Sequence, residues 1–150
     1  MQATSFGAPV TIGTVTESGH IRERFPGGTN YLIDMSSSGS ANVFSDWYEY
    51  WPVTDEVVYL CGITTREMGH TNGIERTVEV GVGPVDSENT IARFVSGQLE
   101  VSEVGVLGSL IYTFAIPITI ASGSRVATRL SDNQGAQHGL KVGLQFYAGL

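Results

Sequence analysis

The fold is decided by residues 112–146, which read YTFAIPITIASGSRVATRLSDNQGAQHGLKVGLQF. Apolar side chains recur at every second position, and their even parity is kept across a Ser122-Gly123 turn and a polar loop over 131–139. A period of two places alternate side chains on one face of a pleated strand, so the even set is predicted to be buried and its odd neighbours exposed. The residues predicted to be buried are Phe114, Ile116, Ile118, Ile120, Val126, Leu130, Val142, Leu144 and Phe146. One buried and one solvated face is typical of an antiparallel sheet.

The rest of the chain also favours strands. Its 150 residues fit one domain, with 41% hydrophobic residues, 15% charged residues and 19 glycines. Further strand-sized segments bounded by turn residues are Tyr31–Ile33, Val43–Trp51, Val57–Thr64, Thr77–Val82, Ile91–Phe94 and Leu99–Val104. No segment shows a sustained helical period. We therefore predict an all-β protein, an antiparallel β-sandwich of jelly-roll type with about eight strands.

The amino-terminal segment differs from the remainder. Residues 1–28 are mostly polar and end in a Pro-Gly-Gly turn or hinge signal, whereas residues 29–150 form the predicted sandwich. Two interpretations stay open for 1–28: an edge strand with a loop, or an extended arm that pairs with a neighbouring subunit. In the second case Arg22, Arg24 and Phe25 are candidate partner-binding residues.

The charge and composition of the chain argue against nucleic-acid binding and against a membrane span. The formal net charge is −7 and Lys141 is the single lysine, which argues against nucleic-acid binding because that requires cations to displace phosphate counterions. The uncharged stretch 104–124 is long enough to span a membrane, but its glycines, Pro117 and β-branched residues favour a strand instead. The first residues lack the features of a signal peptide.

Chemically active groups do not form a recognisable motif. His20, His70 and His138 are far apart in loop contexts, and Cys61 lies in an apolar run as a buried hydrophobe would. The loop 84–89 carries oxygen ligands but misses the EF-hand spacing, so a turn is preferred to a calcium site. The paired acids Asp55-Glu56 also follow a turn. We expect no enzyme activity, no metal and no cofactor.

The aromatic segment over residues 47–51 is the strongest candidate recognition surface. On a regular strand Trp47 and Trp51 face one way, and Tyr48 and Tyr50 face the other. Such aromatics serve as core and interface anchors, or they stack on sugar rings in a lectin-like module. Because a single sandwich would leave one aromatic pair uncovered, we expect a homo-oligomer, specifically a trimer.

Three segments resemble small virion proteins of tailed bacteriophages, many of them marine. The first is the aromatic strand 46–49 with the following strand 57–60, and the second is the strand 79–84 with its loop 87–89. The third and most specific is the hairpin IPITIASGSRVATR over 116–129. The resemblance covers residues 43–146 and implies a jelly-roll sandwich and a structural role on the virion, as a head decoration or cement protein.

The hairpin also has a physical rationale. Gly123 supplies the turn conformation, and Pro117 lacks an N–H, which places its strand at an edge or at a bulge. Arg125 and Arg129 share one polar face, where they pair with acids of a neighbour or are solvated. We therefore predict a protein of the phage head surface, made in the host cytoplasm, that binds the major capsid protein and itself. The alternative is a carbohydrate- or receptor-binding module of a tail or fibre.

Overall fold

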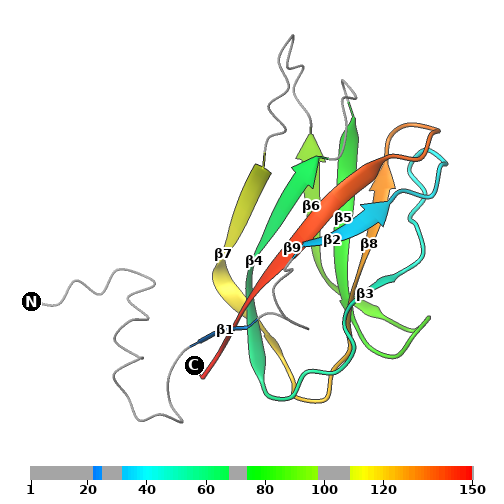
Figure 1. Cartoon of the computed structure of the whole chain (residues 1–150). Helices are drawn as coiled ribbons and strands as arrows, with labels where there is room; N and C mark the ends of the chain where they lie inside the picture. The colour runs from blue at the N-terminus through cyan, green and yellow to red at the C-terminus, as the bar shows by residue number, and fades with distance from the viewer. Residues whose placement is uncertain (1–21, 25–31, 68–73, 98–108, 150) are drawn as a thin grey trace, which may run out of the picture.

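The computed structural model describes residues 22–24, 32–67, 74–97 and 109–149, and the regular elements in these residues are all β-strands (Figure 1). Their bounds are β1 (Arg22–Arg24), β2 (Leu32–Ser36), β3 (Tyr48–Trp51), β4 (Val58–Glu67), β5 (Glu75–Val82), β6 (Asn89–Gly97), β7 (Ser109–Ile120), β8 (Val126–Asp132) and β9 (Gly139–Ala148). The predicted strand Leu99–Val104 lies outside the described residues. No helix long and apolar enough to cross a membrane occurs in the described part of the chain.

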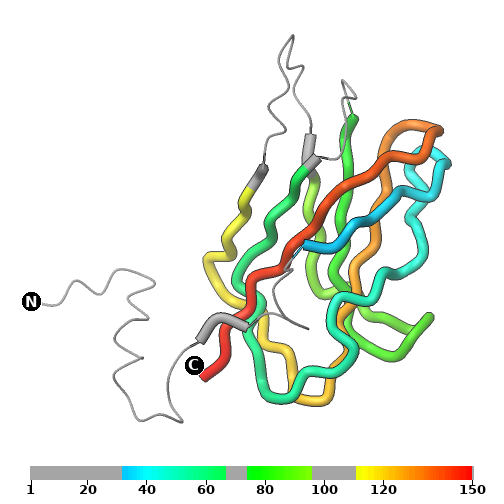
Figure 2. Tube along the Cα trace, in the orientation of Figure 1, coloured from blue at the N-terminus to red at the C-terminus, as the bar shows by residue number. Residues whose placement is uncertain are grey.

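The strands form two antiparallel sheets that pack face to face. The five-stranded sheet has the order β1-β9-β4-β7, with β2 also paired to β9, and the four-stranded sheet has the order β3-β8-β5-β6. Strand β2 pairs with β9, β3 with β8, β4 with β7, and β5 with β6. This nesting is that of one long hairpin rolled across itself, so that segments from the two ends of the chain lie side by side (Figure 2). The predicted antiparallel β-sandwich is confirmed, and its topology is that of a jelly roll.

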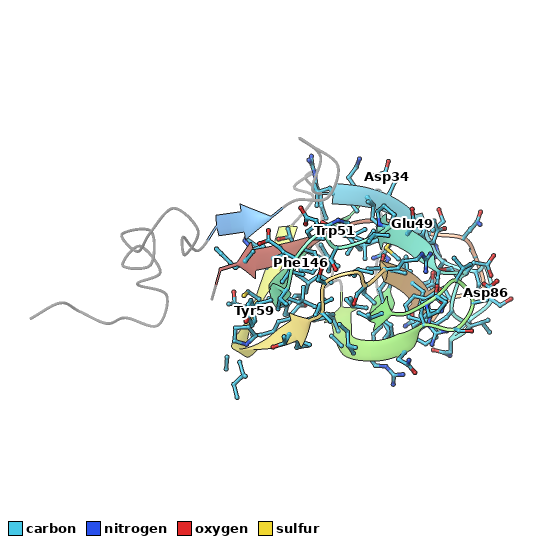
Figure 3. The ribbon with its side chains drawn as sticks, turned by 90° about the horizontal axis from the view of Figure 1, so that it is seen from below. Asp34, Glu49, Trp51, Tyr59, Asp86 and Phe146 are labelled. Carbon is cyan, nitrogen blue, oxygen red and sulfur yellow. The ribbon has the colours of Figure 1, made fainter. Side chains whose placement is uncertain are left out.

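Apolar side chains from both sheets fill the interior. Phe146 of β9 is fully buried and packs edge-on against Trp51 of β3, with ring centroids 5.4 Å apart (Figure 3). The predicted core residues with less than a tenth of their surface exposed are Ile120, Val126, Leu130, Val142, Leu144 and Phe146. Phe114 and Ile118 are half-buried against this core. The even-numbered residues of β8 and β9, and most of those of β7, therefore form the inward face.

One member of the even set does not obey the parity. Ile116 is 81% exposed, so its predicted burial is wrong. Leu60 of β4 stands opposite Ile118, but Gly62 stands opposite Thr113, so residues 114–117 of β7 face a single residue of β4. This large irregular bulge interrupts the pairing of β7 with β4, and Ile116 within it points outward. Pro117 lies in the bulge of an edge strand, as the sequence predicted.

The odd-numbered residues of β8 also depart from the prediction. Ala127 and Ser131 are buried rather than exposed, because β8 is a central strand whose outer face is covered. Ala127 stands beside Gly81 of β5, and the ring of Trp47 lies over Gly81. On β7 the odd residues Thr113, Ala115 and Thr119 are exposed as expected.

Residues 22–24 extend the five-stranded sheet. In β1, Arg22 stands opposite Ala148 and Arg24 opposite Phe146, on the same edge of β9 that β2 occupies further along. These three residues therefore act as an edge strand of their own chain. The remainder of the segment 1–28, including Phe25, lies outside the described residues, and its role as an arm stays a prediction.

Candidate functional site

A bulge in β3 redirects the aromatic segment. Tyr48 and Glu49 pair in register with β8, but the register shifts between Glu49 and Trp51, which leaves Tyr50 as the extra residue. Tyr50 and Trp51 are consequently both buried in the core, and the prediction that Trp47 and Trp51 share a face is wrong. The Tyr50 hydroxyl accepts a hydrogen bond from Leu144 N (2.8 Å) and donates one to Leu144 O (3.3 Å). Neither Tyr50 nor Trp51 is available to a partner.

Tyr48 also points inward. Its hydroxyl accepts a hydrogen bond from Ser36 N at 3.0 Å and donates one to Ser36 O at 3.1 Å, which links β3 to β2 of the opposite sheet. Because Tyr48, Tyr50 and Trp51 all serve the chain's own sandwich, the reason given for a trimer, an uncovered aromatic pair, does not hold in this structure.

Trp47 lies on the outer face of the four-stranded sheet. The predicted strand Val43–Trp51 becomes regular only at Tyr48, and Ser45 N donates instead to Leu130 O at 2.8 Å. The guanidinium of Arg129 lies 4.4 Å from the centre of the Trp47 ring and 4.5 Å from that of Phe44. Both distances fit cation–π attraction. The segment before β3 thus covers the sheet with two aromatic rings that contact one arginine.

A buried carboxylate anchors the same arginine. Glu79 lies between Val78 and Val80 on β5, points to the outer face and is completely shielded from solvent. It accepts hydrogen bonds from Arg129 Nε (2.7 Å), Arg93 Nε (2.7 Å) and Thr90 Oγ1 (3.2 Å), so one carboxylate joins β5, β6 and β8. Burial raises the pKa of Glu79, but the hydrogen bonds and charges of Arg93 and Arg129 outweigh it and lower the pKa overall.

A second arginine makes a parallel link. Arg125, directly before β8, donates from Nε to Glu49 Oε2 of β3 at 3.0 Å and from Nη1 to Glu88, whose side chain is buried. Burial lowers the pKa of Arg125, but the two carboxylates raise it overall. Arg125 and Arg129 therefore share one polar face, as predicted, but they pair with acids of their own chain, which neither open alternative anticipated.

We call this group the outer-sheet layer; its members are Phe44, Trp47, Glu49, Glu79, Glu88, Arg93, Arg125 and Arg129. Three arginines balance three glutamates, so the layer is neutral and ties four strands and a loop together. Arg93 and Glu49 expose 63% and 50% of their side chains, which makes them its accessible charges. Sequence reasoning missed Glu79, although an acid between two core valines is the signal that marks it.

A second polar cluster joins the loop after β2 to the β8–β9 loop. His138 Nδ1 lies 3.0 Å from Asp132 Oδ2, and Gln134 N donates to Asp132 Oδ1 at 2.9 Å. Ser37 Oγ accepts a hydrogen bond from His138 N at 3.0 Å, and the Ser37 side chain also forms a hydrogen bond with Asp132. Burial raises the pKa of Asp132, but these hydrogen bonds, and the charge of His138 when protonated, lower it overall. In a catalytic triad the histidine side chain lies between the serine and the acid, whereas here the acid lies between the serine and the histidine side chain. We therefore interpret the cluster as a structural link between the two loops.

The other candidate groups are placed as follows. The loop 84–89 is a turn in which Ser87 N donates to Pro84 O, Asp86 is exposed and Glu88 turns toward Arg125. Within the described residues, no three His, Cys, Asp or Glu side chains are close enough to hold a metal ion. Burial raises the pKa of the half-buried Cys61 thiol. His20 and His70 lie outside the described residues.

No protein-family model and no curated protein matches this sequence. Among solved structures, the chain is similar to the infectious bursal disease virus VP2 subviral particle and to the Gx strain of infectious bursal disease virus. Each match has 8% sequence identity, a TM-score of 0.41 and covers 85% of this chain. The chain spans about a third of the length of those two structures, 32% in each case.

Proposed function

We propose that this protein is a structural component of a virion, and specifically a decoration or cement protein that bridges neighbouring capsid subunits on a tailed-phage head. The observation that carries the proposal is the jelly-roll topology built around a buried apolar core that both sheets share. Jelly rolls of this kind recur in viral capsids. Because the core residues are buried, we assign binding to the outer faces, edges and loops of the sandwich.

The hairpin that resembles phage virion proteins supports the same proposal. Gly123 forms its turn with a positive φ of 80°, a conformation that other residues resist. Arg125 and Arg129 then fasten β8 to three other parts of the chain through Glu49, Glu88 and Glu79. The resembling residues thus make the sandwich rigid, which is what a protein that resists capsid expansion requires.

The mechanism is adhesion without turnover. A rigid body that contacts two capsid subunits at once keeps them together, since separating them breaks both contacts. The net charge of −7 favours electropositive surfaces on the capsid. The partner is the major capsid protein, and the product of binding is a mechanically stabilised head.

Quantitative mass spectrometry of purified virions tests the proposal. The expected result is this chain in copy number comparable to that of the major capsid protein. Copy numbers typical of a tail or fibre would instead favour the receptor-binding alternative. Complete absence from particles that carry the other virion proteins would refute both.

The carbohydrate alternative loses its main support in this structure. Stacking on a sugar requires a free aromatic face, but the Trp47 ring contacts Arg129 and covers Gly81, and Trp51 lies in the core. We therefore favour the capsid role.

A further inference from the structure

Strand β7 is a long edge with a hydrogen-bonding partner on one side only. Within the described residues it pairs with β4 and with no other strand, and it is the outermost strand of the five-stranded sheet (Figure 1). An unpaired edge offers a row of backbone donors and acceptors to another strand. Natural proteins usually protect such an edge with charged residues, a short length or a bulge.

Among the described edge strands, β7 is the one that contains no charged residue. Its sequence SLIYTFAIPITI has no charged residue, and the uncharged stretch extends over 104–124. By contrast, β1 carries Arg22, β2 carries Asp34, β3 carries Glu49 and β6 carries Arg93. The protective features of β7 are the bulge over 114–117 and Pro117 within it, and both leave the first half of the strand regular.

Exposed apolar side chains gather on this edge. Ile111 and Ile116 of β7 are 67% and 81% exposed, the latter being the most exposed of the large hydrophobic residues described. Val95 of the adjoining strand β6 is also exposed, and its carbonyl oxygen accepts a hydrogen bond from Tyr112 at 3.4 Å. A charge-free edge flanked by exposed isoleucines has the composition of a contact surface rather than of a solvated one.

We propose that β7 pairs with β7 of a second copy of this chain, in antiparallel orientation about a two-fold axis. Two copies with a formal charge of −7 each repel one another, and an edge without charges is where they approach at the lowest electrostatic cost. A two-fold axis makes the paired strands antiparallel and makes the contact reciprocal, so each copy contributes the same isoleucines. The two five-stranded sheets then become one continuous sheet.

The bulge determines the extent of the pairing. Residues 109–113 are in regular register with β4, so their outward backbone groups are aligned for a further strand. Residues 114–117 leave that alignment, and Pro117 has no N–H to donate. The ladder between copies therefore uses residues 109–113, while Ile116 packs against the partner as a side-chain contact. The inference goes beyond the proposed function and does not depend on it.

Sedimentation velocity over a range of protein concentrations tests the proposal with one double variant and a matched control. Ile111→Lys with Ile116→Lys adds two charges to the edge, whereas Val53→Lys with Val85→Lys adds the same charges at valines that are similarly exposed elsewhere. The wild type is expected to form a dimer that the edge variant weakens by at least about tenfold and the control leaves within about twofold. A wild type that stays monomeric at submillimolar concentration overturns the proposal, as does a dimer that the edge variant leaves intact.

Hydrogen exchange on the wild type provides a readout that does not require a variant to fold. Amides within 109–113 are expected to gain protection as the concentration rises, and those of β3 and β6 are expected to show no change. Protection confined to β3 or β6 would assign the interface to another edge and refute the proposal. Because neither experiment involves a particle, failure of self-association leaves the proposed capsid role standing, and absence from virions leaves the dimer standing.

Discussion

Replacing Glu79 by glutamine tests whether the outer-sheet layer stabilises the sandwich. The substitution keeps the size of the side chain but removes the charge that neutralises Arg93 and Arg129. Because Glu79 is fully buried and lies between two core valines, the new amide has no route to solvent.

The expected loss of stability depends on how exposed the two arginine partners of Glu79 are. Breaking a buried ion pair by removing one charge costs about 3–5 kcal/mol. Arg93 and Arg129 expose 63% and 30% of their side chains, so water recovers part of that loss. The glutamine side chain also keeps one oxygen that accepts a hydrogen bond. We therefore expect a loss of about 2–3 kcal/mol in the free energy of unfolding, at or below the low end of the range for a buried pair.

Urea unfolding at pH 7, followed by tryptophan fluorescence and far-UV circular dichroism, measures the loss. For a chain of this size it corresponds to a decrease of about 4–12 °C in Tm. The matched control is Glu49→Gln, which removes one half-exposed carboxylate while Arg125 keeps Glu88, and it is expected to cost less than about 1 kcal/mol.

Two results would refute the reasoning. If Glu79→Gln cost no more than Glu49→Gln, the layer would be a solvated set of surface pairs. If a double change of Glu79→Gln with Arg129→Met cost as much as the sum of the single changes, the two residues would not be coupled, although their atoms lie 2.6–2.7 Å apart.

Three further predictions concern the core, the bulge and acid stability. Phe146→Ala should lower the free energy of unfolding, measured by urea titration, by about 3–5 kcal/mol, since the ring is fully buried against Tyr50 and Trp51. A loss below about 1.5 kcal/mol would show that the site collapses or is loosely packed. Gly62→Ala should cost about 1–3 kcal/mol because a Cβ there meets Tyr112 O at 2.5 Å, whereas Gly135→Ala, with nothing within 4 Å, should be close to neutral; equal Tm values would contradict the close approach. The folded-state pKa values of Glu79 and Asp132 lie below their ordinary values of 4.5 and 3.8, so in acid the native state binds fewer protons than the unfolded state. Tm should therefore fall as the pH drops below about 4.5, and it should fall less steeply in Glu79→Gln, which lacks one of the two carboxylates.

The sequence was sufficient wherever a local pattern controls the outcome. Alternation over 112–146 predicted two or three strands and, with the exception of Ile116, their inward-facing residues, since side-chain direction on a regular strand has a period of two. Gly123 predicted a turn that requires a positive φ, and Pro117 predicted an edge or a bulge. These features depend on a few adjacent residues, and the structure contains all of them.

Bulges could not be predicted in the same way. Trp51 points into the core and Ile116 points outward because β3 and β7 each contain extra residues relative to the strand they pair with. The number of extra residues depends on the register between strands that are distant in sequence, which local spacing does not show.

The sequence by itself determined the class of fold, the two-residue period of the core and the absence of a recognisable catalytic motif, because these follow from composition and local spacing. Only the tertiary structure decided the partners of the arginines. Arg129 meets Glu79 across 50 positions and Arg125 meets Glu49 across 76, and each of these contacts exists because the rolled hairpin sets β8 between β3 and β5. Sequence spacing shows that two arginines share a face, but the acids they find there depend on which strands the fold places alongside.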